Sequence, residues 1–114
     1  MQQMSTVEHP GMVVVLTTFA TEHEARLAVR TLVAAGIAAC GSVVPGITSF
    51  YMWNGELCET RECQVLLKIP RSNINDVGNA LANIHTYEVP EFICLDVLAS
   101  SKAYSTWVLA GGMA

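Results

Sequence analysis

The sequence is organised around residues 39–70, which read ACGSVVPGITSFYMWNGELCETRECQVLLKIP. Both halves of this stretch are rich in β-branched and aromatic residues, which favour extended strands. Asn54-Gly55 separates the halves, and this dipeptide is the strongest short signal for a tight hairpin turn, because both residues tolerate positive φ. We therefore predict one long β-hairpin, broken on its first arm at Pro45-Gly46.

The predicted hairpin is longer than a compact globule of this chain would be. Each arm has roughly 15 residues and would extend ~50 Å at about 3.3 Å per residue. A compact chain of 114 residues has a radius of gyration of ~13 Å and a diameter of roughly 35 Å. The hairpin must therefore bend at Pro45-Gly46 or project from the globule. A projecting tip would aggregate unless another chain covered its apolar residues, Phe50, Tyr51, Met52, Trp53 and Leu57.

The composition also indicates a subunit of an assembly. Hydrophobic residues make up 52% of the chain and charged residues only 14%, which is apolar for a small domain and favours a large interface. The net charge is −4 with six basic residues and no basic cluster, so we expect no nucleic-acid partner and no membrane partner. The four cysteines show neither a metal-binding nor a disulfide-rich spacing, which favours a reducing, cytoplasmic location.

The remaining periodicity predicts a strand, a helix and a second helix–strand pair around the hairpin. Residues 12–19 form a short β-branched strand that is apolar on both faces. A helix begins at Thr21 and ends at Gly36, and a second begins near Ser72-Asn73 and runs to Ile84. Residues 92–98 form the last strand, and residues 102–109 a short final helix.

This order, β-α-β-β-α-β with a terminal helix, predicts an α+β, ferredoxin-like sandwich. We expect one domain over residues 12–110, with a flexible leader at 1–11 and a flexible tail at 111–114. Right-handed crossovers place both long helices on one face of the sheet. The other face is left open although the strands are apolar on both faces, which again suggests that partner subunits cover it.

A family resemblance is carried by short motifs spread from about Met12 to Val108. The motifs are Ala38-Ala39-Cys40, Val44-Pro45-Gly46, Tyr51-x-Trp53-x-Gly55, His85-x-Tyr87-Glu88-Val89-Pro90-Glu91 and Tyr104-x-x-Trp107. Together they resemble the CutA family, the divalent-cation tolerance proteins. The resemblance implies a compact homotrimer similar in architecture to the PII signalling proteins, and a role in copper and divalent-metal tolerance. The chain departs from the family at Gly41-Ser42, where Val-Asn is usual, and at Thr86, where proline is usual.

Cys40 and His85, with Glu88 and Glu91 nearby in sequence, are the candidate metal ligands. Thiolate, imidazole and carboxylate groups suit copper(II) or another divalent metal. Each residue also has an ordinary structural interpretation. Cys40 is equally typical of a small buried hydrophobe, and His85 of a helix C-terminal residue whose charged form the helix dipole favours.

A second set of residues, Tyr51, Trp53, Glu62, Lys68 and Tyr87, is predicted to line a cleft between subunits. The alternative for the aromatic residues is a plain interface, where such residues are enriched. Lys68 lies within an apolar strand and needs a carboxylate partner, for which Glu62, Glu88 and Glu91 are candidates. An anion-binding role for Lys68 is the other interpretation.

The sequence does not predict an enzyme, because it lacks a nucleophile–base pair with an orienting group and a glycine-rich phosphate loop with an arginine. Two functional hypotheses follow. The first is a trimeric copper and divalent-metal tolerance protein that binds metal ions. The second is a PII-like signalling trimer that binds a small anionic ligand in its inter-subunit clefts.

Overall fold

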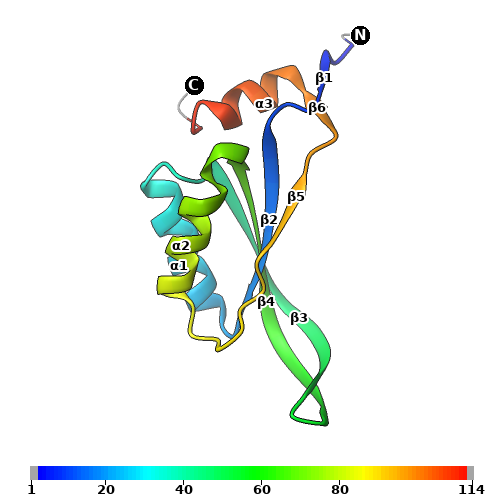
Figure 1. Cartoon of the computed structure of the whole chain (residues 1–114), viewed down its shortest axis with the longest axis vertical. Coiled ribbons are helices and arrows are strands. Elements are labelled where there is room, and N and C mark those ends of the chain that lie inside the picture. The colour runs from blue at the N-terminus through cyan, green and yellow to red at the C-terminus, as the bar shows by residue number, and fades with distance from the viewer. Residues whose placement is uncertain (1–2, 113–114) are drawn as a thin grey trace.

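A four-stranded antiparallel sheet with two helices on one face forms the body of the molecule (Figure 1). This computed structural model describes residues 3–112. The spatial order of the strands is β3-β4-β2-β5. In sequence the elements are β2 (Met12–Phe19), α1 (Glu22–Ala34), β3 (Cys40–Trp53), β4 (Glu56–Pro70), α2 (Ile74–Ile84) and β5 (Ile93–Asp96). A single 3-10 turn, Arg71–Asn73, precedes α2. This topology confirms the predicted ferredoxin-like α+β fold.

The long hairpin formed by β3 and β4 dominates the shape. Its strands pair from Cys40↔Lys68 to Trp53↔Glu56, and the register shifts between Val44 and Ile47, at the predicted break. The turn residues Asn54 and Gly55 have φ of 50° and 79°, as a primed hairpin turn requires. The tip extends beyond the helices (Figure 1). The molecule measures 51 × 29 × 22 Å with a radius of gyration of 15.5 Å, above the ~13 Å of a compact chain of this length.

The hydrophobic core lies between the helices and one face of the sheet. Alternate residues of the central strands point into it and are buried: Val13, Val15, Val65, Leu67 and Ile69. Both helices present their apolar stripes to these strands, with Ala25, Ala28 and Leu32 from α1 and Val77 and Leu81 from α2. The predicted helical faces therefore contain the residues that build this core.

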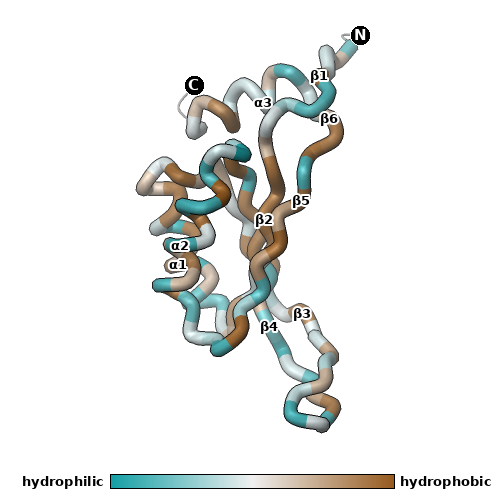
Figure 2. The backbone as a smooth tube through the Cα atoms, in the orientation of Figure 1, coloured by the Kyte–Doolittle hydropathy of each residue, from teal (hydrophilic) through white to brown (hydrophobic). Residues whose placement is uncertain are grey.

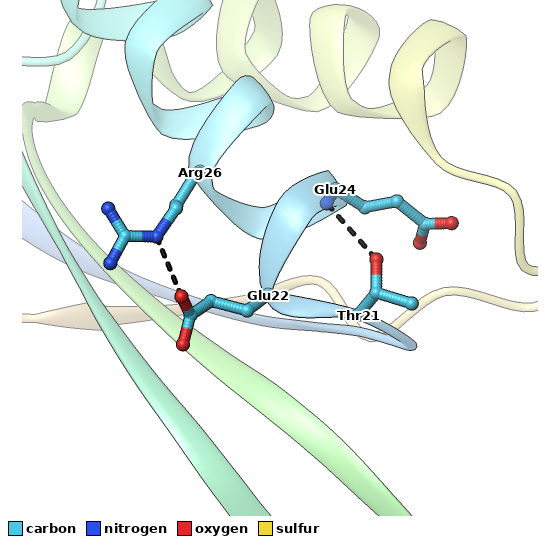
Figure 3. A network of polar contacts seen from close by, with 4 residues as sticks. All are labelled: Thr21, Glu22, Glu24 and Arg26. Carbon is cyan, nitrogen blue, oxygen red and sulfur yellow. Dashed lines mark hydrogen bonds and ion pairs between the residues drawn. The ribbon is translucent and has the colours of Figure 1, made fainter.

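Local signals set both ends of α1. Thr21 accepts a hydrogen bond from the Glu24 backbone N–H at 3.1 Å, and Arg26 pairs with Glu22 at 2.9 Å (Figure 3). Gly36 has φ of 76°, and the bonds from Gly36 N to Val33 O and from Ile37 N to Leu32 O form a Schellman motif. The predicted cap and stop are thus both confirmed.

The packing around Gly41 accounts for one difference between this chain and the family that its sequence resembles. A Cβ atom at this position would lie 2.8 Å from Leu67 Cδ2 and 2.8 Å from Val29 Cγ1. Such distances are shorter than carbon atoms tolerate in a packed core, where added volume causes strain. In this chain the side chains of Val29 and Leu67 fill the space that a valine at position 41 would need.

The second face of the sheet is apolar and open. Val14 pairs with Leu95, and Leu16 pairs with Ile93, so these four side chains share one face. Ile93 and Leu95 are 44% and 49% exposed, and Val44, on the same face, is 42% exposed. Figure 2 shows hydrophobic segments along these strands and at the hairpin tip. The prediction of doubly apolar strands over an uncovered face is therefore confirmed for β2 and β5.

The chain ends differ from the predictions. Thr6–Glu8, inside the predicted leader, forms β1 and pairs with β6 (Ala99–Ser101). The last predicted strand, 92–98, is shorter in the structure, because β5 ends at Asp96. The final helix α3 (Lys102–Leu109) is closed by bonds from Gly111 N to Val108 O and from Gly112 N to Trp107 O. The predicted tail thus begins with two bonded glycines, and residues 113–114 lie outside the described residues.

Over residues 3–112, no helix is both long enough and apolar enough to cross a membrane.

Candidate functional site

A pocket of about 440 Å³ lies where the hairpin leaves the sheet and the loop after α2 passes beside it. It contains four residues of the predicted cleft and two of the predicted metal ligands. Its lining consists of Thr18, Tyr51, Trp53, Cys58, Glu62, Tyr87, Glu88, Val89, Pro90 and Glu91. We refer to it as the hairpin pocket.

Strand alternation decides which hairpin residues line the pocket. Tyr51 pairs directly with Cys58, so both point to the same face of the hairpin. Trp53 lies two residues beyond Tyr51, and Glu62 four residues beyond Cys58, which keeps them on that face. Phe50, Met52 and Leu57 point to the opposite face and are 63%, 62% and 73% exposed. We call this second surface, made by Phe50, Met52 and Leu57, the bare face of the hairpin.

Hydrogen bonds fix the loop against the sheet. The Tyr87 hydroxyl donates to Glu62 Oε2 at 2.5 Å, and Gln64 Nε2 donates to Glu91 Oε2 at 3.2 Å. Gln64 also donates to the Thr17 carbonyl oxygen at 2.8 Å, which ties the loop to β2. Burial and the hydrogen bond to Glu62 raise the pKa of Tyr87 well above its usual value. Tyr87 therefore stays protonated and acts as a donor at neutral pH.

His85 is enclosed by aromatic rings at the end of α2. Its ring stacks on Phe19 at a centroid distance of 4.2 Å and contacts Tyr87 at 5.0 Å. Nε2 lies 3.2 Å from Thr17 Oγ1, and Nδ1 accepts a long hydrogen bond of 3.5 Å from the Tyr87 backbone N–H. Because Nδ1 accepts, the neutral ring carries its proton on Nε2.

Burial lowers the pKa of His85, although a backbone hydrogen bond at Thr18 and the carboxylates of Glu24 and Glu62 act in the opposite direction. Desolvation is the largest of these effects, so the charged form that the helix end was expected to favour is disfavoured overall. His85 is a neutral ring at pH 7.

The Thr17–His85 pair resembles a nucleophile and its base but lacks their chemistry. Thr17 is completely buried, so a substrate cannot reach its hydroxyl. The His85 nitrogen that faces Thr17 carries the ring proton and has no lone pair to accept another. This pair is a structural contact rather than a catalytic one.

Within one chain, Cys40 lies apart from His85. Cys40 is level with Lys68 and Val14, whereas His85 contacts Thr17, three positions along β2 and two strands away. This offset amounts to ~10 Å along the strands and roughly 10 Å across them. Cys40 Sγ instead contacts Tyr104 Oη at 3.3 Å, and this hydrogen bond, with burial, raises the pKa of Tyr104 to about 12.

No three His, Cys, Asp or Glu side chains in residues 3–112 lie close enough together to hold a metal ion. The predicted ligands Glu88 and Glu91 line the hairpin pocket, while Cys40 does not. Lys68 also lies outside this pocket, and it is not a member of either ion pair found in the described residues, Arg26–Glu22 and Arg71–Asp96. The carboxylate partner predicted for Lys68 is therefore not supplied within residues 3–112.

Cys58 and Gln64 are among the residues of this region that sequence reasoning did not assign to a site. Cys58 and Cys63 lie an odd number of residues apart on β4, so their side chains face opposite sides: Cys63 is buried, whereas Cys58 lines the pocket. Counting pairs outward from Asn54-Gly55 would have placed Cys58 opposite Tyr51. Gln64 had no such signal, because its role depends on the position of the loop that carries Glu91.

Comparison with known proteins identifies the family of this chain. Residues 13–110 match the family model described as CutA1 divalent ion tolerance protein. The chain belongs to the CutA1 family. A divalent-cation tolerance protein CutA from Thermus thermophilus is 35% identical over 95 residues, covering 83% of this chain and 92% of the relative.

Solved structures of CutA1 family members share the fold. CutA from Synechococcus elongatus is 34% identical, with a TM-score of 0.89 over 94% of this chain and 95% of that one. A second structure of that protein, complexed with a Bis-Tris molecule, has a TM-score of 0.87 at 34% identity, over 94% of this chain and 99% of that one. These matches confirm the resemblance and the ferredoxin-like architecture.

Proposed function

We propose that this CutA1 family member is a cytoplasmic homotrimer that takes part in divalent-metal tolerance and binds copper(II) or another divalent metal. Family membership supports the tolerance role. The open apolar face of the sheet is the observation that supports assembly, because an isolated subunit would expose it to water. The number three comes from the family resemblance. The proposal is a binding protein rather than an enzyme.

Two further features of the subunit bear on assembly. Lys68 lies half-buried on the open sheet face, and its ammonium group would need a carboxylate partner once a further copy covered the face. A neighbouring copy can supply that carboxylate. The bare face of the hairpin adds exposed apolar side chains that extend beyond the body of the subunit. A trimer that covered both surfaces could pair Lys68 with a carboxylate and would remove the apolar side chains of the hairpin from water.

The proposed metal ligands are His85, Glu88 and Glu91, with Cys40 as a ligand that only a neighbouring copy could bring near. Both ring nitrogens of His85 already have hydrogen-bond contacts, so a metal ion must displace one of them. We therefore expect weak binding that folding does not require. Ligation needs a neutral ring, and the pKa of His85 is lowered, so copper affinity should persist to below pH ~6.5, the usual value for histidine.

Calorimetric Cu²⁺ titration of the wild type, His85→Ala and Cys40→Ser at two pH values tests this proposal. We expect His85→Ala to lower Cu²⁺ affinity by about tenfold, the loss of ~1.4 kcal/mol of binding free energy. The matched control is His23→Ala, which removes an exposed histidine on α1. If His85→Ala and His23→Ala bind Cu²⁺ as tightly as the wild type does, the metal role of His85 is excluded.

The second candidate function is the binding of a small molecule in a PII-like trimer. The hairpin pocket favours it, because its volume of about 440 Å³ lies within the usual range of ligand sites, roughly 300–1,000 Å³. The Synechococcus relative complexed with Bis-Tris, an amine that carries hydroxyl groups, supports the same function for this chain. The lining does not favour the predicted anionic ligand, because three glutamates and no basic residue line the pocket.

A further inference from the structure

We propose that the hairpin pocket selects a small organic ammonium ion, recognised by the carboxylates of Glu62, Glu88 and Glu91 and by the rings of Tyr51, Trp53 and Tyr87. This inference rests on the second candidate function, that the pocket binds a small molecule. It adds the chemical class of the ligand. Neither the family description nor the fold specifies that class.

The lining of the hairpin pocket is negatively charged. Three of the ten lining residues are glutamates and none is basic. Tyr87 donates to one oxygen of Glu62, and Gln64 to one oxygen of Glu91. Both donors are neutral groups, so they orient the carboxylates without cancelling their charge. A cation entering the pocket is attracted by these charges, and an anion is repelled.

The aromatic residues favour an organic cation over a hydrated metal ion. Tyrosine and tryptophan rings attract ammonium groups through their quadrupoles, and clusters of such rings recognise quaternary ammonium ligands. Val89 and Pro90 add apolar surface to the same lining. A hard divalent cation gains nothing from apolar contact and requires converging oxygen ligands.

The spacing of the acidic groups supports the same choice. A metal ion needs several ligand atoms within ~2.0–2.6 Å of its centre. The described residues contain no group of three that meets this need. The pocket volume of about 440 Å³ is many times the ~30 Å³ share of one water molecule. The pocket therefore suits a molecule with a charged head and several carbon atoms.

A charge-matched pair of probes tests the proposal. Choline and 3,3-dimethyl-1-butanol have the same shape, but only choline is charged. Each is titrated into the full-length assembled protein in the presence of EDTA, and binding is followed by calorimetry. We expect choline to bind about tenfold more tightly than the neutral alcohol, from ring and carboxylate attraction combined, and acetate to show no binding.

A single-tryptophan variant locates the binding. The chain has two tryptophans; Trp53 lines the pocket, whereas Trp107 packs beside Val108 in a separate cluster. In a Trp107→Phe protein, choline should change the fluorescence of Trp53. If this variant does not fold, calorimetry on the wild type and on the glutamate variants still decides the question.

Glu88→Gln removes a charge from the pocket at nearly constant shape. We expect it to weaken choline binding about three- to fivefold, as expected for a solvent-exposed carboxylate, and to leave the neutral alcohol unaffected. The matched control is Glu59→Gln, because Glu59 is exposed on the same hairpin but lies outside the pocket lining. We expect the control to bind choline as the wild type does.

The outcomes separate this inference from the function on which it rests. Equal affinity for choline and the neutral alcohol, or equal effects of Glu88→Gln and Glu59→Gln, would overturn ammonium selectivity while small-molecule binding stands. Binding of neither probe by calorimetry would overturn both. The copper titration is a separate experiment, because Glu88 and Glu91 belong both to the proposed metal site and to the hairpin pocket, and EDTA keeps metal ions out of the choline titrations.

Discussion

His85 is the residue whose surroundings in the structure differ most from those that its predicted role required. As a predicted ligand it needed a free ring nitrogen. In the fold it lies between Phe19 and Tyr87, and both nitrogens have partners. The aromatic residues of the cleft were predictable, because strand alternation groups Tyr51 with Trp53. The stacking of His85 was not, because it depends on how a loop closes against a strand that is distant in sequence.

A pH dependence of stability follows from the buried His85 ring. Burial lowers its pKa in the folded state, so the unfolded chain binds a proton more readily. The contribution to stability is therefore full above pH ~6.5 and is lost as the pH falls below it. We expect the melting temperature of the wild type to fall more between pH 7.5 and 5.5 than that of His85→Gln.

Thermal melts at these two pH values, with His23→Gln as the control, check this expectation. His23 is exposed on α1, so its substitution should leave the pH dependence of the wild type intact. Identical pH dependence in the wild type and His85→Gln would show that the ring gains no proton on unfolding.

At the scale of elements, the break at Pro45-Gly46 controls the faces of the long hairpin. The residue numbers of paired positions sum to 109 on the tip side of the break, as for Trp53↔Glu56, and to 108 beyond it, as for Cys40↔Lys68. A shift of one residue moves every later side chain to the other face. The sequence predicted the hairpin, its turn and its break, but the size of the shift had to come from the structure.

The short β1–β6 pair could not be predicted for a related reason. Each strand has three residues, too few to show a periodic pattern. Their pairing depends on the end of β5 arriving beside the N-terminal segment. The prediction of a flexible leader treated a polar composition as evidence against strand pairing. Thr6–Glu8 nevertheless pair with β6 through backbone groups, and polar side chains do not prevent such pairing.

The bare face of the hairpin should contribute to assembly. Phe50→Thr combined with Leu57→Thr keeps residues that favour strands but removes apolar side chains, each worth about 1.5–3 kcal/mol when fully buried. We expect the subunit concentration at which the assembly dissociates to rise by at least ~10-fold. Light scattering over a dilution series measures this change.

Glu59→Thr is the control for the double variant. Glu59 is the exposed cross-strand partner of Phe50 on the hairpin, and its substitution removes no apolar side chain. We expect Glu59→Thr to dissociate at the wild-type concentration. Unchanged dissociation of the double variant would exclude the bare face from the interface and leave the open sheet face as its main part.

At the scale of the whole molecule, shape and composition point to the same conclusion. The subunit is 51 Å long, has one sheet face without a covering layer, and has only 14% charged residues. An isolated domain of this size needs a more polar surface to stay soluble. Each of these properties is explained if further copies cover the open sheet face and the bare face of the hairpin.

The mass of the particle in solution tests this account most directly. Sedimentation equilibrium of the purified protein at micromolar concentration, with EDTA present, measures it without reference to shape. We predict a single species of three times the 12.3 kDa chain mass. The exposed apolar surfaces favour assembly, the family resemblance implies three subunits, and neither argument requires a metal. A stable species of one chain mass at the same concentration would contradict the account.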